Sequence, residues 1–432
     1  MIRLRPAFAL SAAALLTLGV ACSDNGAGTD NQNQNQEEEV PSFPSYCHIT
    51  EWECEEFDDG PALPSNRHSH QTVVIDHERI LLMGGFERLE TGSSARIFSC
   101  EILNPLTAEV REVDCFNRDR MDFATIQLAD QSVLIIGGSS PSGDRKTSVE
   151  RFDPDEERWA TMAAMPTWGD PAYRVRELQP MLMEDGRVFV LRIQEVFGSH
   201  NPAYVDAVIY DPEENQWSAV EGLPTNEPDT VGGVMLDGDR VLMVIAEPDS
   251  ITNNPPPPPE NQEPRPPGHT LRMGVFHIDA EEWEPLPGFN VRGIGLRPEF
   301  AYLPERGFFL INIPGDDEEP AYGYLFDPDS FFRQQFYERE PAPGRIATVL
   351  PGDRVLFQSN DFVQYYDLET DFWWMFDAFP PGLFYSSLVQ LDDCRLFGSG
   401  ERALLGEDGG ELRGVDTAFC TPQGEPVDNR DL

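Results

Sequence analysis

Lysine is almost absent from this chain, which has Lys146 alone, and histidine occurs at only seven positions. The 31 lysine and arginine residues are far outnumbered by 76 aspartate and glutamate residues, so the formal net charge at pH 7 is −45. Such a surface repels nucleic acids and anionic lipid head groups, because both are negatively charged. The composition therefore argues against nucleic-acid binding. It favours cationic partners or divalent ions, and it also suits a surface that only keeps the protein soluble.

Several motifs of enzymes and metalloproteins are missing as well. The sequence has no glycine-rich phosphate loop, no His-Glu-x-x-His motif, no Gly-x-Ser-x-Gly motif, no EF-hand loop and no Cys-x-x-Cys pair. Beyond the N-terminus no apolar run is long enough to span a membrane. Apolar residues at helical spacing are nearly absent, which leaves a chain of short strands.

One short strand recurs seven times. Each copy is a polar or glycine residue followed by mostly apolar residues, and the copies begin at Arg79, Ser132, Arg187, Arg240, Gly307, Arg354 and Cys394. Turn-forming residues precede most copies, as expected for a hairpin. A repeat of roughly 40–55 residues that consists of short strands is typical of propeller blades.

A second hairpin follows each of these strands. A turn residue is followed six positions later by a residue that is usually large and apolar, as in Asn104/Val110, Asp153/Trp159, Asp211/Trp217, His277/Trp283, Asp327/Arg333, Asp367/Trp373 and Gly406/Leu412. Proline often stands second in the turn, where its fixed φ fits. Two hairpins per repeat predict an all-β, seven-bladed β-propeller with four-stranded antiparallel blades over residues 47–420.

These features resemble the kelch repeat. That family pairs two glycines after the second strand with an aromatic residue before the turn and a tryptophan in the fourth strand, and this chain has Gly84-Gly85, Gly137-Gly138, Phe152 and Trp159 in those places. The resemblance implies a kelch-like propeller. The galactose oxidase family shares the fold, but its copper site of two tyrosines, two histidines and a cysteine cannot be assembled from this sequence. Sialic acid mutarotases, also kelch-like, rely on arginine and glutamate around the channel.

The N-terminus has the pattern of an export signal. Arg3 and Arg5 precede an apolar stretch, residues 7–20, and the run Gly19-Val20-Ala21-Cys22 resembles a bacterial lipobox in which Cys22 carries the lipid. Ser23 resembles the outer-membrane sorting pattern. We therefore expect a signal peptide at 1–21 and a bacterial outer-membrane lipoprotein, periplasmic or surface-exposed.

The remaining boundaries follow from composition. Residues 22–46 are rich in asparagine, glutamine and glutamate, so we expect a lipidated, disordered tether. We expect the propeller at 47–420 and a C-terminal tail at 421–432.

The cysteines also suggest export. Apart from Cys22 there are six, namely Cys47, Cys54, Cys100, Cys115, Cys394 and Cys420. Disulfides are favoured outside the cytoplasm, and six cysteines allow 15 pairings. Cys100 and Cys115 lie on the two arms of one hairpin and make the best pair. The other four sit near the chain ends, where disulfides would staple the ring shut.

Two segments compete for the strand that closes the ring. Residues 51–57 could complete the last blade from the N-terminal side, because Trp52 stands as far before Arg67 as Trp159 stands before Arg174. Residues 411–419 could do so from the C-terminal side. Closure removes the exposed sheet edge in either case.

Residues before the first strand of several repeats are candidates for a binding site in the channel. They are Arg67, His68, His70, Arg120, Arg174, Arg292 and Arg345. The arginines could bind a carboxylate, or they could form ion pairs between blades. His68 and His70 could hold a metal, although the kelch pattern often places arginine and histidine here for structural reasons, and we expect no metal site.

Acidic turns such as Asp237-Gly238-Asp239, residues 316–319 and Asp392-Asp393 could bind calcium, which takes several oxygen ligands. Solvated hairpin tips are the alternative, and no other cofactor is indicated. No catalytic residue can be assigned. The sequence thus predicts an exported, membrane-tethered, non-enzymatic scaffold that binds a protein or glycan. The alternative is a carbohydrate-active enzyme, of mutarotase or oxidase type, that uses an arginine-lined channel.

Overall fold

The computed structural model describes short stretches of the chain separated by gaps. The described residues are 58–59, 63–64, 67, 69–89, 94–116, 120–140, 142, 146–167, 173–196, 204–224, 230–248, 269–286, 291–293, 298–304, 306–313, 321–331, 333–339, 345–350, 352–358, 363–375, 383–391, 396–402 and 417–420. All of them belong to one compact unit, residues 47–432. The predicted signal peptide, lipidation site, tether and tail lie outside these residues.

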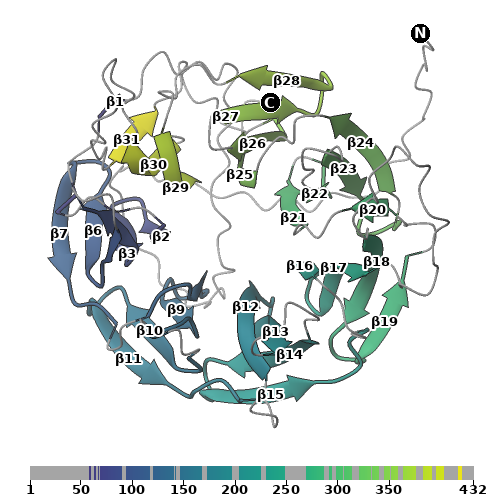
Figure 1. The fold of residues 1–432 in the computed structure, drawn as a ribbon, viewed down its shortest axis with the longest axis horizontal. Coiled ribbons are helices and arrows are strands. Elements are labelled where there is room, and N and C mark those ends of the chain that lie inside the picture. Colours follow the sequence, from purple (N-terminus) through teal and green to yellow (C-terminus); the bar gives the residue numbers. More distant parts are fainter. Residues whose placement is uncertain are drawn as a thin grey trace, which may run out of the picture. The chain divides into compact units, whose positions relative to one another are not determined.

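The described secondary structure consists of strands in antiparallel sheets (Figure 1). Blade 1 contains β2 (Gln71–Asp76), β3 (Arg79–Met83), β6 (Cys100–Asn104) and β7 (Glu109–Val113). Blade 2 contains β8 (Ala124–Gln127), β9 (Val133–Ile136), β10 (Val149–Asp153) and β11 (Arg158–Met162). Blade 3 contains β12 (Tyr173–Leu182), β13 (Val188–Val196), β14 (Tyr204–Asp211) and β15 (Gln216–Val220).

The next sheet has five strands. It contains β16 (Thr230–Asp237), β17 (Arg240–Pro248), β18 (His269–His277), β19 (Glu282–Pro285) and the short β20 (Val291–Gly293), which pairs with β18. Two four-stranded blades follow. One contains β21 (Glu299–Leu303), β22 (Phe308–Ile313), β23 (Ala321–Phe326) and β24 (Arg333–Arg339), and the other β25 (Arg345–Leu350), β26 (Arg354–Gln358), β27 (Val363–Asp367) and β28 (Phe372–Met375).

The closing sheet joins the two ends of the described chain. It contains β29 (Leu383–Gln390), β30 (Leu396–Arg402), β31 (Thr417–Cys420) and, outermost, β1 (Asp58–Asp59). Asp58 pairs with Phe419 and Asp59 with Ala418. The outermost strand therefore comes from the N-terminal side, while the C-terminal segment supplies the third strand. Residues 51–57, where this strand was predicted, lie outside the described residues.

The architecture is an all-β propeller with four-stranded antiparallel blades, as predicted. Six sheets have four strands, as expected. The β16–β20 sheet differs because β20 pairs with His269–Leu271, the first residues of β18, and adds a fifth strand. A two-stranded hairpin, β4 (Phe86–Arg88) with β5 (Ser94–Arg96), is inserted between β3 and β6 and was not predicted. No helix long and apolar enough to cross a membrane occurs in the described part of the chain.

Burial explains why the repeat is visible in the sequence. Second strands such as β3 and β9 are almost entirely buried, because neighbouring sheets cover both of their faces, and they therefore read as apolar runs. Outer strands such as β7 and β11 alternate between exposed and half-buried residues. The apolar clusters lie between sheets: one combines Leu81 and Ile102 of blade 1 with Ile135 and Phe152 of blade 2.

The innermost strands contact one another in chain order. β2 contacts β8, β8 contacts β12, and the series continues through β16, β21 and β25 to β29, which contacts β2. The first and last sheets are therefore neighbours (Figure 1). Each innermost strand of the described sheets therefore has another innermost strand on both sides.

Candidate functional site

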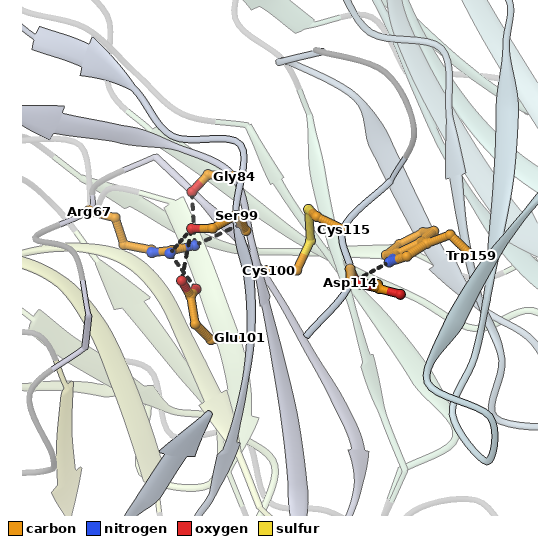
Figure 2. Close-up of a disulfide and its surroundings, with 8 residues drawn as sticks. All are labelled: Arg67, Gly84, Ser99, Cys100, Glu101, Asp114, Cys115 and Trp159. Atoms are coloured by element: carbon orange, nitrogen blue, oxygen red, sulfur yellow. Dashed lines mark hydrogen bonds and ion pairs between the residues drawn. A yellow bond between two sulfur atoms is a disulfide. The ribbon is translucent and has the colours of Figure 1, made fainter. Parts of the chain in front are cut away.

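Arg67, the first predicted channel residue, is buried just before β2 and is held inside blade 1 (Figure 2). Its Nη2 forms an ion pair with Glu101 and donates to Ser99 Oγ at 2.9 Å. Its Nη1 donates to the carbonyl oxygens of Gly84 at 3.2 Å and Ser99 at 3.4 Å. The guanidinium thus ties the entrance of the first strand to the second and third strands of the same sheet.

Glu101 is the acidic partner in this arrangement. Burial raises the pKa of its carboxyl above the usual 4.5, while the charge of Arg67 and a hydrogen bond from Ser99 oppose that rise. Breaking such a buried pair leaves one uncompensated charge inside the protein. The charges of Glu101 and Arg67 therefore compensate each other inside blade 1.

Blade 2 repeats the arrangement. Arg120 is buried before β8, forms an ion pair with Glu150, and donates to the carbonyl oxygens of Gly137 at 3.3 Å and Ser148 at 2.9 Å. In both cases the arginine and its acid belong to one blade, so these two are not the ion pairs between blades that the sequence also allowed. Glu101 and Glu150 were not predicted from the sequence. A glutamate in the third strand, three residues before the turn residue, is the signal that would have found them.

The other predicted channel residues occupy different positions. Arg174 lies in β12 and Arg345 begins β25, both first strands of their sheets, whereas Arg292 lies in β20, which pairs with the preceding sheet. Their side chains, and the whole of His68, fall outside the description. These three arginines therefore do not occupy equivalent positions in their sheets.

His70 lies at the meeting point of the first and last sheets. It is buried, and its Nε2 shares a 2.7 Å hydrogen bond with Ser399 Oγ of β30. Thr72 Oγ1 lies 3.5 Å from the same hydroxyl. His70 thus joins parts of the chain separated by 329 positions.

Polar side chains on inner strands also connect neighbouring blades. Gln179 of β12 exchanges two hydrogen bonds with the backbone of Gly233 in β16, at 2.8 and 3.1 Å. Glu299 of β21 accepts from the backbone N–H of Ile346 in β25 at 2.7 Å. These groups hold the ring together.

The predicted disulfide between Cys100 and Cys115 is present, with a Cα–Cα distance of 5.0 Å (Figure 2). Cys100 begins β6, and Cys115 lies just beyond β7. Cys420 ends β31, although its side chain is not described. Cys22, Cys47, Cys54 and Cys394 lie outside the described residues.

Tryptophans of the outer strands pack between blades. Trp159 of β11 donates its indole N–H to the carbonyl oxygen of Asp114, just after β7, at 2.9 Å. Trp217 of β15 donates in the same way to Ala163, just after β11, also at 2.9 Å. The tryptophan that marks the repeat therefore fastens each of these blades to the preceding one.

The acidic turns considered for calcium are partly described. Asp237 forms an ion pair with Arg240, and the hydrogen bond from Arg240 lowers the pKa of Asp237. Residues 316–319 and 392–393 fall outside the description. Among the described residues, no group of three or more histidine, cysteine, aspartate or glutamate side chains is arranged to hold a metal ion.

Comparison with known proteins agrees with this geometry. Residues 125–166, which cover most of blade 2, match the Kelch motif. No curated protein matches the chain. Among solved structures, a fungal alcohol oxidase of the AA5 family, in complex with copper, matches with a TM-score of 0.56 and 13% identity over 84% of this chain and 77% of that one.

These findings support a kelch propeller. At 13% identity the structural similarity shows the fold alone. The motif match coincides with the blade that holds Arg120, Glu150, Gly137 and Trp159. The segment that matches the Kelch motif therefore contains residues that build blade 2 and its contacts, namely Gly137, Glu150 and Trp159.

Proposed function

We propose that this kelch propeller is an exported, membrane-tethered scaffold that binds a protein or a glycan and catalyses no reaction. The proposal rests on the contacts of those predicted channel residues whose side chains the structure describes. Arg67 and Arg120 are neutralised by Glu101 and Glu150 inside their blades, and His70 is bonded to Ser399. Catalytic groups more often retain perturbed, accessible titratable atoms in a cleft.

Export rests on the sequence and on one structural feature. The Arg3/Arg5 region, the apolar stretch 7–20 and Cys22 together follow the pattern of a lipoprotein signal. The Cys100–Cys115 disulfide suits an oxidising compartment. We propose a lipid on Cys22, a tether at 22–46, and a bacterial outer-membrane location.

We also propose that the β16–β20 sheet is the seventh blade, equivalent to the six four-stranded ones. Its main path β16–β17–β18–β19 has the same order as theirs, and β16 contacts the innermost strands on both sides. The fifth strand, β20, is then an addition to the edge of a standard blade.

Charge complementarity supports a cationic partner for the scaffold. The chain's net charge of −45 attracts basic surfaces and repels nucleic acids. The turns between third and fourth strands carry exposed acids in several blades, including Glu156, Glu213 and Asp329. Calcium bound at acidic turns is the weaker alternative to a cationic partner within this proposal.

The second candidate is a carbohydrate-active enzyme. The fold similarity to an alcohol oxidase favours it, since the same scaffold supports catalysis there. The described residues of this chain provide no cluster that fits a copper ion, so no step through copper is derived. Arg174, Arg292 and Arg345 remain its proposed channel residues.

The test is crosslinking in intact cells that produce the lipidated full chain, followed by purification and identification of bound molecules. We expect one dominant protein or glycan among the crosslinked molecules. A Cys22→Ser variant should lose this partner only if membrane tethering is needed for the two molecules to meet. Membrane fractionation of the same two proteins tests the anchor. Turnover of any sugar in a panel assayed for oxidation and anomer conversion, without a captured partner, would overturn the scaffold proposal.

A further inference from the structure

The segment that leaves blade 1 toward blade 2 is held by a disulfide. Cys115 lies two residues beyond the end of β7 and is half-buried, whereas Cys100 at the start of β6 is fully buried. The bond therefore ties the connecting segment, which continues to β8, back to the third strand of blade 1.

The residues on either side of Cys115 contact the next blade. Asp114 accepts the indole N–H of Trp159, and the ring of Phe116 packs edge-on against the same tryptophan with centroids 5.7 Å apart. Phe116 also packs against Phe123 at 5.2 Å. Trp159 in turn lies 5.1 Å from Phe152 of blade 2. The disulfide is thus the covalent support of the surface on which blade 2 docks (Figure 2).

Blade 2 provides an internal comparison. The alignment of Ser99-Cys100-Glu101 with Ser148-Val149-Glu150 places Val149 where blade 1 has Cys100. Ala163 accepts from Trp217 as Asp114 accepts from Trp159, which places Ala164 where blade 1 has Cys115.

Noncovalent contacts hold the exit segment in blade 2. The backbone N–H of Met165 donates to Thr147 at 2.8 Å, and Arg192 of blade 3 donates to the carbonyl oxygen of Pro166 at 2.6 Å. The same tryptophan junction is therefore built once with a disulfide and once without.

We propose that the Cys100–Cys115 disulfide is a redox-sensitive clasp of the junction between blades 1 and 2. A dithiol reductant can act on the more accessible sulfur: its thiolate bonds to Cys115 Sγ and displaces Cys100 as a thiolate, which takes a proton. The second thiol of the reductant then displaces Cys115, which also takes a proton. Two electrons and two protons pass to the protein, and the dithiol becomes a cyclic disulfide.

Reduction frees the exit segment without removing the apolar cluster around it. The hydrogen bond from Trp159 to Asp114 and the contact with Phe116 then depend on a segment with more conformational freedom. Local opening of this kind increases backbone exchange near the junction while the rest of the fold stays closed. The clasp thus controls one junction of the ring.

The test is hydrogen–deuterium exchange of the full chain with and without a dithiol reductant, read by peptide mass. We expect exchange within 109–116 and 158–162 to rise about tenfold on reduction. Exchange within 163–165 and 216–220, at the junction of blades 2 and 3, should change little. Alkylation with mass analysis establishes that Cys100 and Cys115 were reduced.

The matched control is the double variant Cys100→Val and Cys115→Ala, which copies the pair of blade 2. It should show fast exchange at the first junction with or without reductant, so any remaining response comes from the other cysteines. Trp159→Phe, which keeps a smaller aromatic ring but removes the indole N–H, should speed exchange in 109–116 even in the oxidised protein. Unchanged exchange after complete reduction would overturn the clasp, and so would a uniform increase over the whole propeller.

Discussion

Blades 1 and 2 differ from the later blades in how they close their sheets. In the first two, a buried arginine bonds to carbonyl oxygens at the glycine pair and to a glutamate in the third strand. At the glutamate position, three residues before the turn residue, four of the five later sheets have Val208, Gly274, Tyr324 and Gln364. An antiparallel sheet of at least four strands forms in both cases.

The difference shows that the buried ion pair is one of several polar contacts that can stabilise a blade. Blade 3 instead uses Arg192 of its second strand, which is buried against Asp206 of the third strand and reaches Pro166 in the segment arriving from blade 2. In the β21–β24 blade, Asn312 approaches Glu299 at 3.4 Å, and Tyr324 fills the core. The Kelch motif match covers residues 125–166, which include Glu150 of blade 2.

The largest loss of stability is expected from breaking one of the buried arginine–glutamate ion pairs of blades 1 and 2. Glu150→Ala leaves the charge of Arg120 buried without its carboxylate, and removing one partner of a buried pair typically costs about 3–5 kcal/mol. Denaturant unfolding should show this loss in the free energy of unfolding. The control is Arg151→Ala, which removes a partly exposed pair with Asp130 and should cost roughly 1 kcal/mol or less. Equal losses would mean that the buried pair contributes no more than a surface pair.

A smaller effect is expected at the glycine pair. Gly138 has φ of 93°, and a Cβ there would lie 2.6 Å from the carbonyl oxygen of Met121. Gly138→Ala should therefore cost about 2–4 kcal/mol, from the left-handed backbone and the steric clash together. Gly186, with φ of 85° and open space around its Cβ position, is the matched control. Gly186→Ala should lose only about 1–2 kcal/mol in the same unfolding experiment. A loss at Gly138 no greater than at Gly186 would show that the close approach is relieved by movement of the chain.

The smallest effect concerns a surface contact between blades 1 and 2. A hydrogen bond from Arg111 holds the pKa of Glu157 below its usual 4.5. Because the folded pKa is depressed, the stabilisation is present above pH 4.5 and is lost as the pH falls through the folded value. Both side chains are partly exposed, so the contribution should be roughly 0.2–1 kcal/mol.

The measurement compares unfolding of the native chain and Glu157→Gln at pH 7 and at pH 3. The native chain should be the more stable at pH 7, and the difference should vanish in acid. A difference that persists at pH 3 would assign the effect to packing of the side chain and not to its charge.

The blade pattern could be predicted because it is local. Turn residues, apolar second strands and the residue six positions after each turn all lie within one hairpin, so their spacing survives in the sequence. The Cys100–Cys115 pair was found for the same reason, since 15 positions separate its members across one hairpin. The candidate site was less predictable. Arg67 and Arg120 were recognised, but Glu101 and Glu150 stand in other strands, and the bonds that join each pair depend on how the sheet folds.

The sequence by itself thus determined the strand content and the repeat. Tertiary structure alone decided which charges neutralise each other, that His70 meets Ser399 across 329 positions, and that β1 rather than the C-terminal segment forms the outer edge of the closing sheet. The reason is physical. Strand formation and turns depend on neighbouring residues, whereas a buried ion pair or a closed ring forms only when segments far apart in the chain are brought together and excluded from water.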